Sequence, residues 1–436
     1  MTDTNDGKMG LWMTSALVVG TIIGAGIFML PVSLAPLGPN ALIGWVISGL
    51  GAMCIAFALA QFSKFGGEGI QANIEREFGQ TIAFLVAWSF WMSDWVAQAS
   101  VAVAAGSTLS FIGGGKELVL PVAIGSVVLL TAINAVGVRA SGGFSIVTVA
   151  IKVLPLLAVI WLFAERGAGG GHYEPLAPAP LNVTNLASAT ALTFFALTGF
   201  ENATSPVGKV RDPERTIFRA LLGGTAFAVL LFLAAGTGIQ MLLPATVVTN
   251  SAAPFADAIA AGWGRGAASL AALAITISAI GCLNCLILGT GELGYAMAAR
   301  GDLPHVMART RGINTPVVAQ MVGSGLSIML ILANSNRATA NLYTFIILLS
   351  TAGVIVLYFV GALAAWKATA KRSARGIIVV ALLFSAYAMY GTGLEADLWC
   401  LVLLATGLVV RAISRWRAGS SRAAATNPAA LPESSS

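Results

Sequence analysis

Four ionisable side chains stand inside long apolar stretches of this chain: Asp94, Lys152, Glu201 and Glu292. On insertion scales, a charged side chain at the centre of a membrane helix costs at least about 2.5–3.5 kcal/mol, so each of the four calls for an explanation. A buried carboxylate attracts a cation or an amine. Burial disfavours the charged form of a lysine, which brings proton exchange near neutral pH within reach. The chemistry indicated is the binding of a charged small molecule or the movement of protons.

The stretches that hold these charges are long enough to be membrane helices. Of the 436 residues, 57% are hydrophobic and only 10% are charged, which excludes a soluble globular domain. A helix crosses a bilayer with about 20 apolar residues, whereas a barrel strand would show about ten residues of alternating character. The sequence therefore predicts an all-α integral membrane protein with twelve spans. They are 11–34, 41–63, 80–106, 118–136, 143–164, 184–204, 216–239, 264–297, 315–333, 340–364, 376–392 and 396–414.

The lysines and arginines predict the orientation of these spans. With the N-terminus in the cytoplasm, 19 of the 24 fall in inner segments, which places both termini on the cytoplasmic side of the cell membrane. The net charge of +6 therefore needs no nucleic-acid partner. We divide the chain into a cytoplasmic N-terminus (1–10), a ten-helix core (11–364), two accessory helices (376–414) and a disordered cytoplasmic tail (415–436).

The residues that could serve an enzyme are sparse. The four cysteines lie within or beside apolar runs, where they act as small hydrophobic side chains. Cys282 and Cys285 have CxxC spacing, but no second pair or histidine cluster accompanies them, so we expect neither a metal nor a cofactor. The two histidines fall in loops, and no set of nucleophile and base is visible. A channel would need a continuous polar pore, and a receptor would need a signalling domain; the sequence favours neither.

Glycines interrupt two of the predicted spans. The first contains "GTIIGAGIF", with Gly24-Ala25-Gly26 at its centre, and the sixth contains "ALTFFALTGFENATSP", with Thr198-Gly199 before Glu201. Such glycines can serve close helix packing, as the four-residue spacing of Gly20 and Gly24 allows. They can also mark points where a helix unwinds and leaves backbone groups free, which is tolerated only around a cavity or a ligand. Freed N–H groups attract a carboxylate and freed carbonyls attract an ammonium, and an amino acid carries both.

Three segments resemble the amino acid–polyamine–organocation superfamily. They are the first-span "GTIIGAGIF", the sixth-span "FFALTGFENATSPVGKVRDPERTIFRA" with its following loop, and "AARGDLPHVMARTRGINTP" after the eighth span. Within the superfamily, the sequence is most similar to the basic amino acid and polyamine antiporters, including the arginine/agmatine exchangers. The resemblance implies two inverted five-helix repeats plus two extra helices, with broken helices 1 and 6 and alternating access. Its members often form homodimers, and this sequence leaves that open.

The resemblance also implies a set of site residues. Asp94 matches a third-span position where the arginine/agmatine exchangers contact the guanidinium end of the substrate, and Glu201 matches a gating or proton-sensing carboxylate. Lys152 is similar to a fifth-span lysine that takes the place of a sodium ion in proton-coupled members. Glu292 we expect at an inner gate or in an ion pair with Arg300. The expected substrate-binding residues are Ile22, Ile23, Gly24, Ala25, Gly26, Ser93, Asp94, Gln98, Val101, Phe195, Thr198, Gly199 and Leu286.

Two departures bear on the substrate. Where the arginine/agmatine exchangers sandwich the guanidinium between tryptophans, this sequence has Phe195 and Leu286. Asp94 could also face Lys152 rather than the substrate. The function predicted is exchange or proton-coupled transport of basic amino acids or their amines, with protons and the bilayer as partners. The alternative is a proton-coupled symporter of neutral amino acids.

Overall fold

The structure is a computed structural model and describes residues 10–24, 26–64, 70–113, 115–136, 142–201, 210–311 and 315–425. Within these residues the chain is mainly helical, with an isolated β-bridge between Arg311 and Thr315 and a further bridge residue at Val210. The helices are α1 (Leu11–Ile22), α2 (Gly26–Leu34), α3 (Pro39–Ala60), α4 (Ile70–Ile112), α5 (Val119–Val136), α6 (Gly142–Ala168), α7 (Val183–Leu197), α8 (Pro213–Leu242), α9 (Ala245–Asn250), α10 (Pro254–Ala299), α11 (Val317–Ala333), α12 (Thr339–Ala368), α13 (Arg372–Thr392) and α14 (Leu394–Ala425).

The prediction of an all-α membrane protein is confirmed. Of the described helices, eight are long and apolar enough to cross a bilayer by themselves: α3, α4, α5 with its preceding turn, α8, α10, α12, α13 and α14. The bent pair α1 and α2 makes a ninth span, and α7 and α11 are shorter apolar helices. With α6, every one of the twelve predicted runs coincides with a helix or a helix pair. The length of the apolar runs therefore located these helices, because a helix needs about 20 apolar residues to cross a bilayer.

Two long helices begin with the same kink. α4 bends at Gly79 (φ 79°, ψ 172°) and α10 bends at Gly264 (φ 81°, ψ 174°), so each carries a short helix before its membrane span. Positive φ favours glycine, which pays no Cβ penalty there. These helices are the third and eighth predicted spans, which would occupy the same position in two five-helix repeats. The shared kink is what such a repeat predicts.

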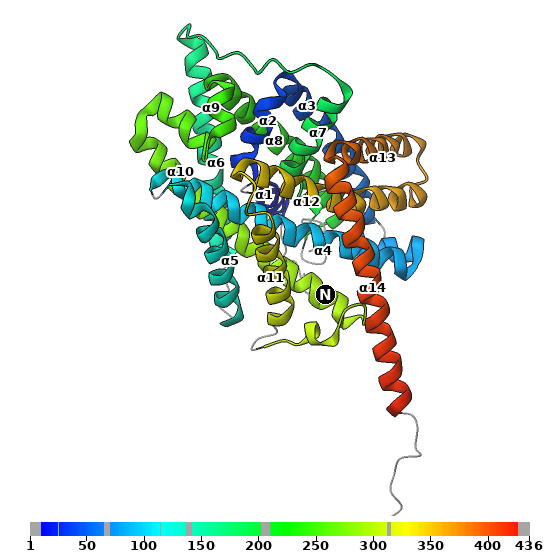
Figure 1. Ribbon diagram of the computed structural model, residues 1–436. Helices are drawn as coiled ribbons and strands as arrows, with labels where there is room; N and C mark the ends of the chain where they lie inside the picture. Colours follow the sequence, from blue (N-terminus) through cyan, green and yellow to red (C-terminus); the bar gives the residue numbers. More distant parts are fainter. Residues whose placement is uncertain are drawn as a thin grey trace, which may run out of the picture.

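The centre of the molecule is formed by α4 and α12. In their most apolar stretches, 72% of the residues are buried, against 22% in α14 and 28% in α5. Figure 1 shows α4 crossing the middle of the molecule, with α14 running along one side and projecting beyond the other helices. α4 packs against α10 on one side and α12 on the other. A helix buried on most of its surface can present side chains both to a cavity and to a supporting neighbour.

The C-terminal segment differs from the prediction. We expected a disordered tail from residue 415, but α14 continues to Ala425, and residues 426–436 lie outside the described part. The sequence there is rich in alanine and arginine, which are good helix formers. Arg411 and Arg415 also bind the loop after α10, which holds the helix in place as it passes residue 415.

Candidate substrate site between two broken helices

The first predicted span is broken where its glycines lie. α1 ends at Ile22, and the Gly24 N–H donates to the Ile22 carbonyl at 2.7 Å across Ile23 (φ −73°, ψ 78°), which is an inverse γ-turn. α2 starts at Gly26 with its axis turned by 45° from that of α1. Ala25 lies outside the described residues. The Tyr343 hydroxyl of α12 donates to the Gly26 carbonyl at 2.5 Å, so a distant helix satisfies one of the backbone groups near the break.

The sixth predicted span is broken as well. α7 ends at Leu197, and both the N–H and the hydroxyl of Thr198 donate to the Phe195 carbonyl, at 3.2 and 2.7 Å. Gly199 follows with φ 110°, and a Cβ there would lie 2.6 Å from the Thr21 carbonyl oxygen. Only glycine fits a position that combines positive φ with so close an approach of backbone. The expectation of two broken spans is confirmed, and the breaks cross where Gly199 meets Thr21.

A cavity lies between the two breaks and is completed by α4, α10 and α12. It holds about 630 Å³ of empty space, including its opening. Backbone and side chains from both breaks line it, together with one face of α4. The predicted residues that line it are Ile22, Gly24, Gly26, Ser93, Asp94, Val101, Phe195, Thr198, Gly199, Glu201 and Leu286. The structure thus brings the predicted residues, from Ile22 to Leu286, into one space.

The cavity contains two acidic side chains. Asp94 and Glu201 both line it, and among its described lining residues there is no lysine or arginine. Asp94 forms no ion pair within the part of the chain that the structure describes. Glu201 accepts hydrogen bonds from the Tyr358 hydroxyl at 2.5 Å and the Gly199 N–H at 3.0 Å, and both donors are neutral. Two carboxylates facing one small space favour a cationic occupant.

Lys152 lies apart from this cavity. It sits on α6 with 6% of its surface exposed, within electrostatic range of the Cys285 thiol on α10. No carboxylate of the described residues comes within 4 Å of its ammonium. Of the two alternatives for Asp94, the structure therefore has this carboxylate facing the cavity rather than pairing with Lys152.

Three other predicted residues are not in the cavity. Gln98 is fully buried. Its amide donates to the Thr290 hydroxyl at 2.6 Å and accepts from the Ser327 hydroxyl at 3.1 Å, so it joins α4 to α10 and α11. Ile23 is buried in the main apolar core. Glu292 is exposed, and its expected partner Arg300 instead binds Glu75 at 2.7 Å. The Arg300 side chain therefore contacts the short helix that precedes the kink of α4.

Sequence reasoning missed several lining residues. Phe90 and Ala97 could have been found, because they share the three- and four-residue spacing of Asp94 and Val101 on one face of α4. Ser350 and Val354 on α12 had no such signal, since nothing in the sequence places the tenth span against the two breaks. The other missed lining residues are Thr21, Ile27, Ala196 and Cys282.

With this geometry in view, comparison with known proteins decides the family. A family model for amino acid permeases matches residues 9–414, which is nearly the whole chain. The chain belongs to the amino acid permease family. This permease is 27% identical over 431 residues to the putrescine transporter PotE of Escherichia coli (strain K12), covering 92% of this chain and 94% of that protein. It is 26% identical over 348 residues to the cadaverine/lysine antiporter of the same strain, covering 77% of each.

A third relative extends the comparison. The putrescine transporter PotE of Haemophilus influenzae is 24% identical over 415 residues, with coverage of 90% of this chain and 93% of that protein. The family model runs from residue 9 to residue 414, so its match includes both broken spans, α4 and α10. The permease is a transporter and not an enzyme, as the sequence predicted.

Proposed function

We propose that this permease exchanges a basic amino acid and its amine across the cytoplasmic membrane by alternating access. The observation that carries the proposal is the position of Asp94, which faces a cavity that no described lysine or arginine lines. The named relatives handle putrescine or exchange cadaverine with lysine, which supports a substrate with a primary ammonium at its far end. They give no support to the symporter of neutral amino acids that the sequence had left as the alternative.

The two ends of the substrate would meet different groups. The first N–H groups of α2, beginning at Gly26, lack partners within their helix and suit a carboxylate. The carbonyl ends of α1 and α7 suit the α-ammonium group, because the helix dipole is negative there. Asp94 would then receive the ammonium at the far end by a charge-assisted hydrogen bond. An amine without a carboxylate would keep the contacts of its ammonium groups and lose those with α2.

The side chains around the cavity favour an alkylammonium over a guanidinium group. Phe195 lies against the first break so closely that a Cβ on Gly26 would be 2.6 Å from its ring. Leu286 lines the cavity without a ring of its own. A planar guanidinium gains most from stacking on tryptophan faces, whereas the aromatic side chains in the described lining, Phe90 and Phe195, are both phenylalanines. Lysine or ornithine and their diamines therefore fit better than arginine and agmatine.

Protons would move through three further groups. Lys152, buried on α6, would release and take up a proton during the transport cycle, and Glu201 would respond to the proton and gate the cavity. Glu292 would act near the inner end of α10. In this proposal both termini lie in the cytoplasm, as the distribution of lysine and arginine favours, and a homodimer stays a prediction from the resemblance.

Counterflow in proteoliposomes tests the proposal. Vesicles that hold the purified permease are preloaded with lysine, ornithine, putrescine, cadaverine, arginine or leucine, and the entry of labelled lysine and putrescine is followed in sodium-free buffer. Entry should require a cationic partner inside and should be fastest with the alkylammonium substrates. Accumulation of labelled leucine under an inward proton gradient, with no entry of lysine or putrescine, would contradict it. Vesicles with the Asp94→Asn variant serve as the control for site-specific exchange.

A further inference from the structure

The membrane-spanning part of α4 has two working faces. Phe90, Asp94, Ala97 and Val101 follow one another at spacings of three and four residues and line the substrate cavity. A second face, turned by more than a quarter of the helix circumference, carries Phe84, Trp88, Trp91 and Trp95, which are all buried. The position of the cavity face therefore depends on what supports the second face.

The cytoplasmic half of that second face is supported by α14. The Trp88 indole N–H donates to the Leu403 carbonyl at 2.8 Å, and a Cβ on Gly407 would lie 2.5 Å from the same indole ring. One turn farther on, the Arg411 guanidinium lies 4.8 Å from the centre of the Phe84 ring. The residues of α14 in this series are spaced by four, so one stripe of the helix runs along α4.

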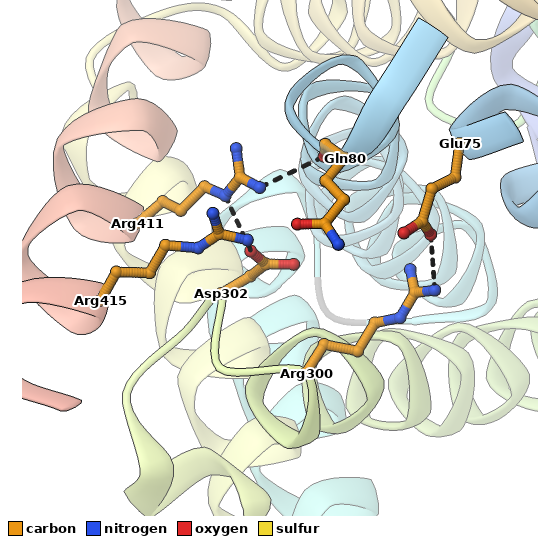
Figure 2. A network of polar contacts seen from close by, with 6 residues as sticks. All are labelled: Glu75, Gln80, Arg300, Asp302, Arg411 and Arg415. Carbon is orange, nitrogen blue, oxygen red and sulfur yellow. Dashed lines mark hydrogen bonds and ion pairs between the residues drawn. The ribbon is translucent and has the colours of Figure 1, made fainter. Parts of the chain in front are cut away.

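The end of this stripe is fastened by an ion cluster, which we call the cytoplasmic clasp and which consists of the buried Asp302 and Arg411 and the half-exposed Arg415. Asp302 lies in the loop after α10 and binds Arg411 at 2.7 Å and Arg415 at 3.0 Å. The side chains of Arg411 and Asp302 are only 6% and 10% exposed. Figure 2 shows both arginines reaching from α14 to Asp302, and Arg411 also reaching the Gln80 carbonyl of α4 at 3.3 Å.

The clasp thus ties three segments that are far apart in the sequence: the loop after α10, the start of the α4 span and the end of α14. Asp302 and Arg411 leave little of their surface to water, so loss of Asp302 would leave the buried Arg411 charge uncompensated. Loss of Arg411 would leave Asp302 with only the half-exposed Arg415 as its partner. The neighbouring ion pair between Arg300 and Glu75 is different, because half of the Arg300 side chain is exposed. The same loop therefore offers a built-in control, since the Asp302–Arg411 pair is buried and the Arg300–Glu75 pair faces water.

We propose that the clasp and Trp88 are positioning residues for transport, which hold α4 through α14 so that Asp94 faces the substrate. α14 is then a working part of the transport core and not an accessory helix. Trp88 precedes Asp94 by six residues, which is about 9 Å along a helix, so a shift of α4 at the clasp displaces the carboxylate as well. This inference rests on the proposed function for the role of Asp94, but its geometric part does not.

The test therefore has one readout that needs no substrate. Ala97→Cys is introduced on the cavity face, with Cys282 and Cys285 replaced by serine, and the rate at which a maleimide alkylates the thiol at position 97 is measured in the purified full-length permease. Asp302→Asn and Arg411→Gln should each change this rate by about fivefold or more, because removing one partner of a buried pair displaces the groups around it. Arg300→Gln, which breaks the exposed pair on the same loop, should leave the rate unchanged.

The second readout is exchange of labelled putrescine and lysine in vesicles, without the three cysteine changes. The clasp variants should lower the maximal rate and raise KM together, while Arg300→Gln should match the unmodified permease. If neither substrate enters even with the unmodified protein, the proposed function fails and the labelling result still tests the clasp.

Two milder variants keep the inference falsifiable if the clasp variants do not fold. Arg411→Lys retains a charge for Asp302 but loses the fork that also reaches Gln80, and Trp88→Phe retains a ring but loses the bond to Leu403. Each should shift the labelling rate in the same direction as the stronger variants, by about twofold or more. Unchanged labelling in both of these variants, in protein that remains monodisperse, would overturn the proposal.

Discussion

Two aspartates in this permease, Asp302 and Asp94, differ in whether the chain itself provides an ion-pair partner for the carboxyl group. Asp302 is bound by two arginines, one of them almost fully buried. Asp94 faces the cavity and forms no ion pair within the described residues. A carboxyl group away from water needs either a positive partner or a proton. Asp302 receives its partners from the chain itself, so it can hold helices together, whereas Asp94 would receive its partner from a visiting substrate, so its occupancy can change during transport.

The largest effect should come from giving Asp94 a permanent partner. Ala97 is three residues farther along the same face of α4, so the ammonium of Ala97→Lys can reach Asp94 and occupy the place of the substrate cation. We expect exchange to fall below detection while the protein stays folded, measured by counterflow and by size-exclusion chromatography. Ala97→Met, which is similar in length but uncharged, is the control and should only slow exchange. Normal exchange by the lysine variant would show that Asp94 does not receive a cation.

The second-largest effect should come from removing the carboxylate of the clasp. Asp302→Asn leaves the buried Arg411 without its countercharge, and we expect a loss of about 3–5 kcal/mol in stability, because that is the usual cost of breaking a buried pair from one side. Thermal unfolding in detergent, with Glu292→Gln as an exposed control, measures the difference. A melting temperature equal to that of the control would mean that the clasp contributes no stability.

Removing the carboxylate from the cavity should cost transport and not stability. Asp94→Asn deletes one charge-assisted hydrogen bond to the substrate, which is worth about 1.5–3 kcal/mol, so kcat/KM for putrescine or lysine should drop by about 10- to 150-fold. The melting temperature without substrate should stay the same or rise, because a buried carboxylate without an ionic partner has been removed. A large fall in melting temperature would place Asp94 with Asp302 as a structural residue.

The smallest effect is expected at the exposed pair. Arg300→Gln breaks the contact with Glu75, but water solvates both groups, so stability should change by no more than about 1 kcal/mol. Raising the salt concentration should remove what effect there is, because the pair is screened. A loss as large as that of Asp302→Asn would show that burial is not what separates the two ion pairs.

Much of the fold follows from local sequence. The helices at the twelve apolar runs were located because an apolar helix must be long enough to cross the bilayer, and each run has about that length. Both breaks were located because glycine is costly in a helix and polar residues at membrane depth need a cavity. Gly199 shows how strict the requirement is, since a Cβ there would lie 2.6 Å from a carbonyl oxygen of the first span.

The residues of the site could be predicted from the sequence only in part. Residues in or beside the breaks, such as Gly26 and Phe195, line the cavity as expected. Gln98 carries the same polar character as a binding residue, yet its amide is used to join α4 to α10 and α11. Its role depends on which neighbour α4 meets at that turn, and the spacing of residues along one helix does not contain that information.

What the sequence by itself determined is therefore the membrane class, the spans, the breaks and the presence of charges that need partners. Only the tertiary structure decided which partner each charge has: two arginines for Asp302, the Tyr358 hydroxyl among others for Glu201, and an open cavity for Asp94. The physical reason is one of range. Helix length and helix breaking are set by neighbouring residues, whereas a buried charge is matched by groups such as Arg411, more than a hundred residues away, that packing alone brings within bonding distance.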